Sequence, residues 1–232
     1  MSDSSNGPAR APADDRIRNE LLRQALSISL AVAPFGVVFG VACAEAGLSP
    51  AVALGYSTLV FAGSAQFAAV DVLGDGGTVA AAVTAGVLLN LRSLAFGVAM
   101  APALTGPVWR RALLSQLIID ESTAVGTARP EIRWRRYGFL AAGLGVFALW
   151  NAATLVGVTA FSSSGDLIER TGLDAAAPAA FLALLWPRLA GAPQRAVAVA
   201  GSLLALALVP IAPAGVPIVA AVLGIVAARW VR

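Results

Sequence analysis

Three ionisable residues interrupt stretches of this sequence that are otherwise apolar. Arg92 lies in the run 76–109, and Asp120 and Glu121 lie together in the run 112–128. A charge near the centre of a bilayer costs about 3 kcal/mol even on the lenient insertion scale, so such a residue usually faces a partner or a cavity. A guanidinium can hold a substrate carboxylate through two hydrogen bonds. A carboxylate can hold an ammonium group or carry a proton.

Two alternatives stay open for these charges. Arg92 could pair permanently with Asp120 or Glu121, or extend to the membrane interface, and both carboxylates could be hydrated there. Neighbouring side chains on a helix point about 100° apart, so we expect that these two carboxylates do not both face one site. Charge attraction in a low-dielectric site predicts that Arg92 and the nearer carboxylate form one functional unit.

Two short motifs should interrupt helices inside apolar segments. Proline removes a backbone donor, so the Pro-Phe-Gly motif at 34–36 predicts a kink or break. The Gly-Ser-Ala-Gln-Phe motif at 63–67 predicts a non-helical or kinked stretch that lines a polar cavity with 34–36. Close helix packing through small residues, with the Gln66 amide bonded across helices, is the alternative. The candidate substrate-binding residues are Pro34, Phe35, Gly36, Gly63, Ser64, Gln66, Asn90 and Arg92, and the candidate coupling residues are Asp120 and Glu121.

Long uncharged runs predict an all-α, polytopic helical bundle in a lipid bilayer. The chain has 232 residues, is 58% hydrophobic and has a mean hydropathy of +0.80. About 20 apolar residues cross a hydrocarbon core of about 30 Å. The segment 78–104 is either one tilted helix or two half-helices that meet at 90–92. We expect seven or eight spans, some of them broken or re-entrant. Besides 78–104, the predicted spans are 24–45, 51–70, 112–128, 137–161, 175–187 and two short ones within 196–228, which 209–217 separates.

Arginine clusters at 16–23, 129–136, 188–195 and 229–232 predict that these segments lie on the cytoplasmic side of the plasma membrane. The N-terminus is then cytoplasmic, with residues 1–23 as a polar tail, disordered in its early part, before a single transmembrane domain at 24–232. The pair Arg110–Arg111 falls outside if 78–104 crosses once. It falls inside if the two halves of 78–104 return, and 112–128 must then be re-entrant.

The composition excludes several kinds of chemistry. All sixteen basic residues are Arg, with no Lys and no His, and Cys43 is the one cysteine. A histidine base, a P-loop lysine, a Schiff base, a histidine-ligated metal and an internal disulfide are therefore excluded. We expect no enzyme, no cofactor and no metal site. Because the arginines cluster at span ends, the net charge of +3 does not indicate a nucleic-acid partner.

A weak internal similarity relates two parts of the chain. The segment at 24–45 followed by 47–67 resembles the one at 137–161 followed by 172–187, at a spacing near 125 residues. Repeats over 24–104 and 137–231 would be typical of a transporter that binds its substrate at the repeat interface.

These motifs together resemble the AzlC family of branched-chain amino acid permeases, which includes YgaZ-type proteins. The matching stretches are PFGVVFG (34–40), EAGLSP (45–50), LVFAGSAQFA (59–68), LLNLRSLAFG (88–97), DES (120–122) and GLDAAAPAAFLALLWP (172–187). The resemblance implies a permease subunit that exports branched-chain amino acids such as valine, with a small AzlD- or YgaH-type partner. Family members often carry His where this chain has Ser93, so a histidine proton relay is excluded at that position.

The leading interpretation is therefore a secondary transporter subunit driven by a proton or ion gradient, with Asp120 or Glu121 as the coupling group. A membrane scaffold without transport of its own is the alternative. A scaffold should tolerate Arg92→Gln or Asp120→Asn with normal efflux, whereas a carrier should not.

Overall fold

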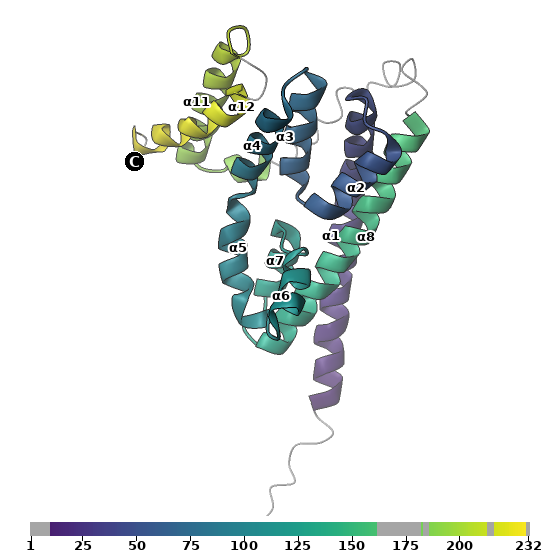
Figure 1. Ribbon diagram of the computed structural model, residues 1–232. Coiled ribbons are helices and arrows are strands. Elements are labelled where there is room, and N and C mark those ends of the chain that lie inside the picture. The colour runs from purple at the N-terminus through teal and green to yellow at the C-terminus, as the bar shows by residue number, and fades with distance from the viewer. Residues whose placement is uncertain (1–9, 162–181, 183–185, 213–215, 231–232) are drawn as a thin grey trace, which may run out of the picture.

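The computed structural model describes residues 10–161, 182, 186–212 and 216–230, and every regular element within these ranges is a helix (Figure 1). The predicted all-α class is confirmed. By length and composition, two described helices can cross a membrane, and a third crossing exists if one bent helix pair counts as a single span. The predicted count of seven or eight spans is not confirmed.

The two long helices, α1 (Arg10–Glu45) and α8 (Ile132–Phe161), lie side by side along most of their length (Figure 1). Leu21 packs on Gly138, Ser29 on Gly145, and the Gly40 backbone on Gly157. Residue numbers rise together in these contacts, so the helices run parallel. Small residues let the two backbones approach closely, as in membrane helix pairs.

α1 also corrects two sequence-based expectations. It continues through Pro34 without a break, because one missing backbone bond is tolerated where α8 supports the helix along its length. It also begins at Arg10, so residues 10–23 are helical rather than a tail. Ion pairs fix this extension to the start of α8: Glu20 with Arg129, and Asp14 with Arg133, each at 2.6 Å.

The segment predicted as the span 51–70 is instead a helical hairpin. α2 (Pro50–Val60) starts near the end of α1, with Pro50 at its first position and the Ser49 hydroxyl as its N-cap. The chain turns at Phe61 and Ala62, and α3 (Gly63–Gly74) returns until Gly74 packs against Ala46. At 11 and 12 residues the helices are about 16–18 Å long, half of a hydrocarbon core.

Of the two alternatives for the segment 78–104, the structure has the two half-helices that meet at 90–92. α4 (Val79–Asn90) and α5 (Arg92–Met100) bend by 42° at Leu91. α4 follows α3, with Gly86 against the Ala65 carbonyl, and α5 continues onward in the same general direction to the short 3-10 helix η1 (Ala101–Ala103) (Figure 1). The two half-helices therefore follow one another along the bundle and do not fold back on each other.

The segment predicted as the span 112–128 is a second hairpin, and it enters from the opposite end of the bundle. α6 (Val108–Ser115) leads to a turn at 116–119, and α7 (Asp120–Thr127) returns toward the start of α8. At the turn Leu117 packs on Gly143, and at the far end Gly126 packs on Phe139. Arg110 and Arg111 therefore lie at the same end as 129–136, which removes the topological conflict that the sequence left open.

The C-terminal helices form a separate group beside α4 (Figure 1). α11 (Ala192–Leu208) follows the 3-10 helix η3 (Trp186–Leu189). α12 (Val216–Ala221) leads into the 3-10 helix η4 (Val222–Trp230), which packs on α11. The predicted division of 196–228 agrees with this arrangement. Residues 162–174 lie outside the described part of the chain, as does almost all of the predicted span 175–187.

Candidate functional site

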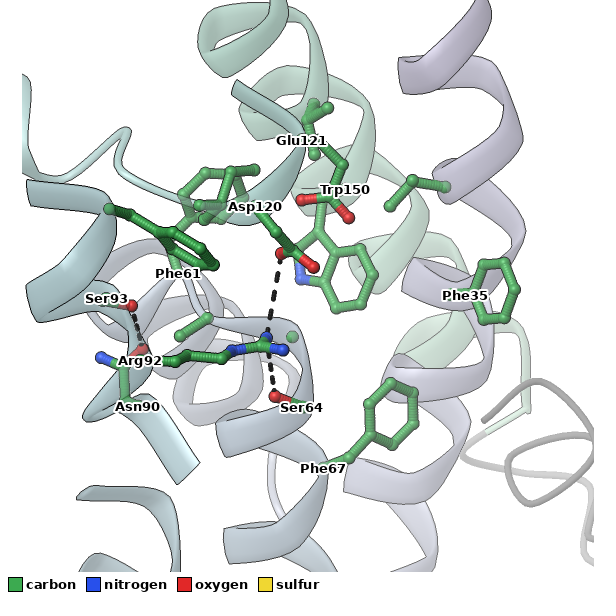
Figure 2. Close-up of a pocket in the computed structure, with 16 residues that line it drawn as sticks. Phe35, Phe61, Ser64, Phe67, Asn90, Arg92, Ser93, Asp120, Glu121 and Trp150 are labelled. Carbon is green, nitrogen blue, oxygen red and sulfur yellow. Dashed lines mark hydrogen bonds and ion pairs between the residues drawn. The ribbon is translucent and has the colours of Figure 1, made fainter. Parts of the chain in front are cut away.

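Arg92 lies where the breaks of three helical segments converge (Figure 2). Its Nη2 donates to the Ser64 hydroxyl at 2.9 Å and lies 3.8 Å from Asp120 Oδ1. Ser64 is in the first turn of α3, Arg92 begins α5, and Asp120 begins α7. The prediction that Arg92 and the carboxylates at 120–121 lie together is confirmed.

The bend at Leu91 positions the arginine. Leu91 closes α4 with a hydrogen bond from its N–H to the Leu88 carbonyl and serves as the N-cap of α5. Beside it, the Ser93 hydroxyl donates to the Asn90 amide oxygen at 2.7 Å. This local bond holds the two half-helices together at the bend, so Ser93 has a structural partner at the position where family members often carry His.

Asp120 and Glu121 occupy the first turn of α7. Ile119 before them is extended (φ −128°, ψ 170°), and the Ser122 hydroxyl donates to the Leu117 carbonyl and accepts from the Ile119 N–H. Carboxylates are stabilised at a helix N-terminus because the free N–H groups there carry partial positive charge.

Both carboxylates border the same cavity, which corrects the expectation that only one could (Figure 2). That expectation assumed a site beside a continuous helix. Here the end of α7 meets the cavity, so side chains pointing in different directions around the axis reach it.

The cavity has a volume of about 220 Å³ and joins a charged side to an aromatic and aliphatic wall. Asn90, Arg92, Asp120 and Glu121 carry its charge and amide groups. The remaining lining residues are Val32, Phe35, Phe61, Ala62, Gly63, Ser64, Phe67, Ser93, Phe96, Ile119, Val146 and Trp150. Such an arrangement suits a small ligand with both charges at one end and a hydrocarbon group at the other.

The 63–67 motif lines this cavity only in part. The chain breaks at Phe61 and Ala62, and Gly63 through Phe67 form the start of α3, so the prediction that the motif itself is non-helical is wrong. Gly63, Ser64 and Phe67 border the cavity, whereas Gln66 is fully buried elsewhere.

Gln66 instead helps to cap the broken end of α2. Its Nε2 donates to the Ser57 carbonyl at 3.3 Å. From the second hairpin, Gln116 Nε2 donates to the carbonyls of Thr58 and Leu59, at 2.8 and 3.0 Å. The last four carbonyls of a helix have no partner within it, so two glutamine amides make the break in α2 possible. The Gln116 amide also joins the two hairpins.

The 34–36 motif contributes one lining residue. Phe35 borders the cavity, but Pro34 is exposed elsewhere and Gly36 packs on the Trp150 backbone. Gly36 therefore serves contact between α1 and α8 rather than substrate binding. A methyl group at Gly36 would lie 2.8 Å from the Trp150 carbonyl oxygen.

Sequence reasoning missed much of the apolar wall, including Phe61, Phe96 and Trp150. Nothing in their types or spacing separates them from ordinary packing residues in an apolar chain. Trp150 stands beside Asn151 in the middle of a long apolar run, and this was the one available signal. Asn151 itself bonds locally, from Nδ2 to the Phe147 carbonyl at 2.8 Å.

Long apolar helices around a cavity that carries an ion pair define a polytopic membrane protein. The family model described as "AzlC protein" matches residues 27–163, more than half of the chain and the whole of both hairpins. The chain belongs to the AzlC family.

Relatives with curated descriptions agree with this assignment. The chain is 26% identical to the "Inner membrane protein YgaZ" of Escherichia coli (strain K12) over 176 residues, which cover 70% of this chain and 69% of the relative. It is 29% identical to an "Uncharacterized membrane protein" of Helicobacter pylori (strain J99 / ATCC 700824) over 100 residues, 43% of this chain and 44% of the relative. No solved structure matches.

Proposed function

We propose that this chain is the substrate-binding subunit of a secondary transporter that exports branched-chain amino acids across the plasma membrane. The observation that carries the proposal is the shared position of Arg92, Ser64 and Asp120 at the meeting point of the helix breaks. Transporters bind substrates near the midplane through discontinuous helices. Membership of the AzlC family supports the same class of protein.

The cavity matches each part of such a substrate. Its carboxylate can take the place of Asp120 on the Arg92 guanidinium, and its ammonium group can bind Asp120 and Glu121. The branched side chain can occupy the wall formed by Phe35, Phe61 and Phe96. Exchange of the Arg92–Asp120 ion pair for two substrate contacts keeps both of these charges compensated when the substrate binds.

The two hairpins supply a means of alternating access. They enter from opposite ends and meet at the cavity, so movement of either one would open it to its own side of the membrane. Coupling to a proton or another cation fits the charge balance, because two carboxylates face one guanidinium. Glu121 or Asp120 would carry the coupling charge. The proposal includes no enzymatic step.

The proposal also covers the topology of the chain in the membrane and its partner subunit. We place the N-terminus and both arginine-rich segments, 110–111 and 129–136, in the cytoplasm. Residues 10–161 hold two helices long enough to cross the membrane, and we propose that the bent pair of α4 and α5 forms a third crossing. A small AzlD- or YgaH-type membrane subunit is the proposed partner.

Export of L-valine from loaded cells tests the function. We expect Arg92→Gln to reduce export at least a hundredfold while the protein still inserts, because the substrate carboxylate loses its guanidinium partner. Arg110→Gln, at an exposed arginine of α6, is the matched control and should retain export.

The measurement should be made with and without the small partner subunit. Normal export by the Arg92→Gln protein would reject the carrier and favour the membrane scaffold. Export from wild-type cells that equals export from cells without the gene would reject amino-acid export altogether.

A further inference from the structure

One polar group in the cavity wall has no partner. Trp150 is only 5% exposed, and within the described residues nothing accepts a hydrogen bond from its indole Nε1–H. An indole nitrogen donates and does not accept. A buried donor without a partner costs about 1–3 kcal/mol, so its persistence calls for an acceptor that enters from outside the chain.

The indole ring is held in a fixed position. Phe39 stacks on it with centroids 6.0 Å apart and an interplanar angle of 24°, and Phe67 meets it edge-on at 6.3 Å. On the backbone side, Gly36 of α1 packs directly on Trp150. These contacts hold the indole ring at the wall of the cavity, where Trp150 is one of the lining residues.

The six-membered ring of the indole lies against the uncapped start of α3. A Cβ built on Gly63 would lie 3.4 Å from Trp150 Cη2 and 3.7 Å from Cζ2. Ala62, the N-cap of α3, provides no side-chain cap. The first-turn N–H groups have no acceptor within the helix and favour negative charge. Asp120, the carboxylate now paired with Arg92, borders the same cavity as Trp150.

We propose that the Trp150 indole N–H donates to the carboxylate of the transported substrate and is a specificity residue for it. This inference rests on the proposed function. Of the three parts of a branched-chain amino acid, the ammonium group only donates and the hydrocarbon does neither, so only the carboxylate accepts. Trp150 and the start of α3 thus complete, with Arg92, a site for that carboxylate. Asp120 is then released from Arg92 to accept from the substrate ammonium group.

The test compares L-valine with isobutylamine, its counterpart without the carboxylate, on purified protein in lipid nanodiscs. Trp150→Phe keeps an aromatic ring and removes the donor. We expect it to weaken L-valine binding on the order of tenfold or more and to leave isobutylamine binding within about twofold, since a hydrogen bond to a charged group is lost only for L-valine. Trp134→Phe, at a buried tryptophan outside this cavity, should change neither.

Equal weakening of both ligands would show a structural role for the indole and overturn the assignment. Unchanged L-valine binding would overturn it as well. If the unaltered protein binds no L-valine, the proposed function fails first, which separates the two failures.

A spectroscopic measurement covers the case in which Trp150→Phe does not insert. The other four tryptophans, Trp109, Trp134, Trp186 and Trp230, are replaced by Phe, and the indole of Trp150 is labelled with nitrogen-15. L-valine should shift its N–H resonance downfield and isobutylamine should not. The same shift with both ligands, or with neither, would refute the contact.

Discussion

The two hairpins place a helix N-terminus at the same cavity, yet they give it opposite character. α3 begins with Gly63 and Ser64 and has no side-chain cap, so its N–H groups remain available to an anion. α7 begins with Asp120 and Glu121, which more than offset the positive end of their own helix. One hairpin therefore favours a carboxylate and the other favours an ammonium group. The difference teaches that one backbone geometry becomes an anion site or a cation site through its first two residues.

The largest expected effect comes from removing that difference. In Asp120→Asn with Glu121→Gln, both hairpins present uncompensated N-termini, so the cation site is lost and the anion site stays. We expect L-valine export to fall at least a hundredfold. The cavity should also lose its preference for L-valine over isovalerate, the analogue without the ammonium group. Competition binding in nanodiscs measures the ratio of the affinities for L-valine and isovalerate. Glu131→Gln, at the exposed arginine-rich end, is the control. A preserved ratio would show that α7 does not bind the ammonium group.

A smaller effect should follow from separating the hairpins. Gln116→Leu removes the amide that bonds the Thr58 and Leu59 carbonyls. Leaving such acceptors without a partner costs about 1–3 kcal/mol, so the protein should melt several degrees lower and export less than wild type. Gln24→Leu on the exposed face of α1 is the matched control for thermal unfolding in detergent. Unaltered melting and export would show that the hairpins do not depend on this link.

The smallest effect is expected from a substitution in the hairpin of α2 and α3, which favours the substrate carboxylate. Ser64→Ala removes one hydrogen bond to Arg92 and leaves the N–H groups of α3 in place. At about 1 kcal/mol this bond should change L-valine affinity roughly fivefold, mainly through the apparent KM for export. Ser115→Ala, which removes a hydroxyl bonded only within α6, should leave the KM unchanged. A complete loss of export in Ser64→Ala would show that Ser64 does more than position Arg92.

Isolated charges and the length of one apolar segment made parts of the site predictable. Arg92, Asp120 and Glu121 stood out because isolated charges in apolar runs need partners. The break at 90–92 was one of two possibilities for a segment too long for one upright span. Pro34 misled, because a proline in a helix packed along its length by α8 need not break it. Gln66 misled because its amide caps a helix end instead of facing a ligand.

The amino-acid sequence by itself determined the class of this protein, the residues that carry charge into its interior and the family to which it belongs. Hydrophobicity reports that a segment lies in an apolar environment, and it does not report whether the segment crosses that environment or turns back. Only the tertiary structure decided that 51–70 and 112–128 are hairpins from opposite ends. The reason is physical: a helix can stop inside an apolar core only where distant groups satisfy its free carbonyls. Here Gln66 and Gln116 satisfy them for α2.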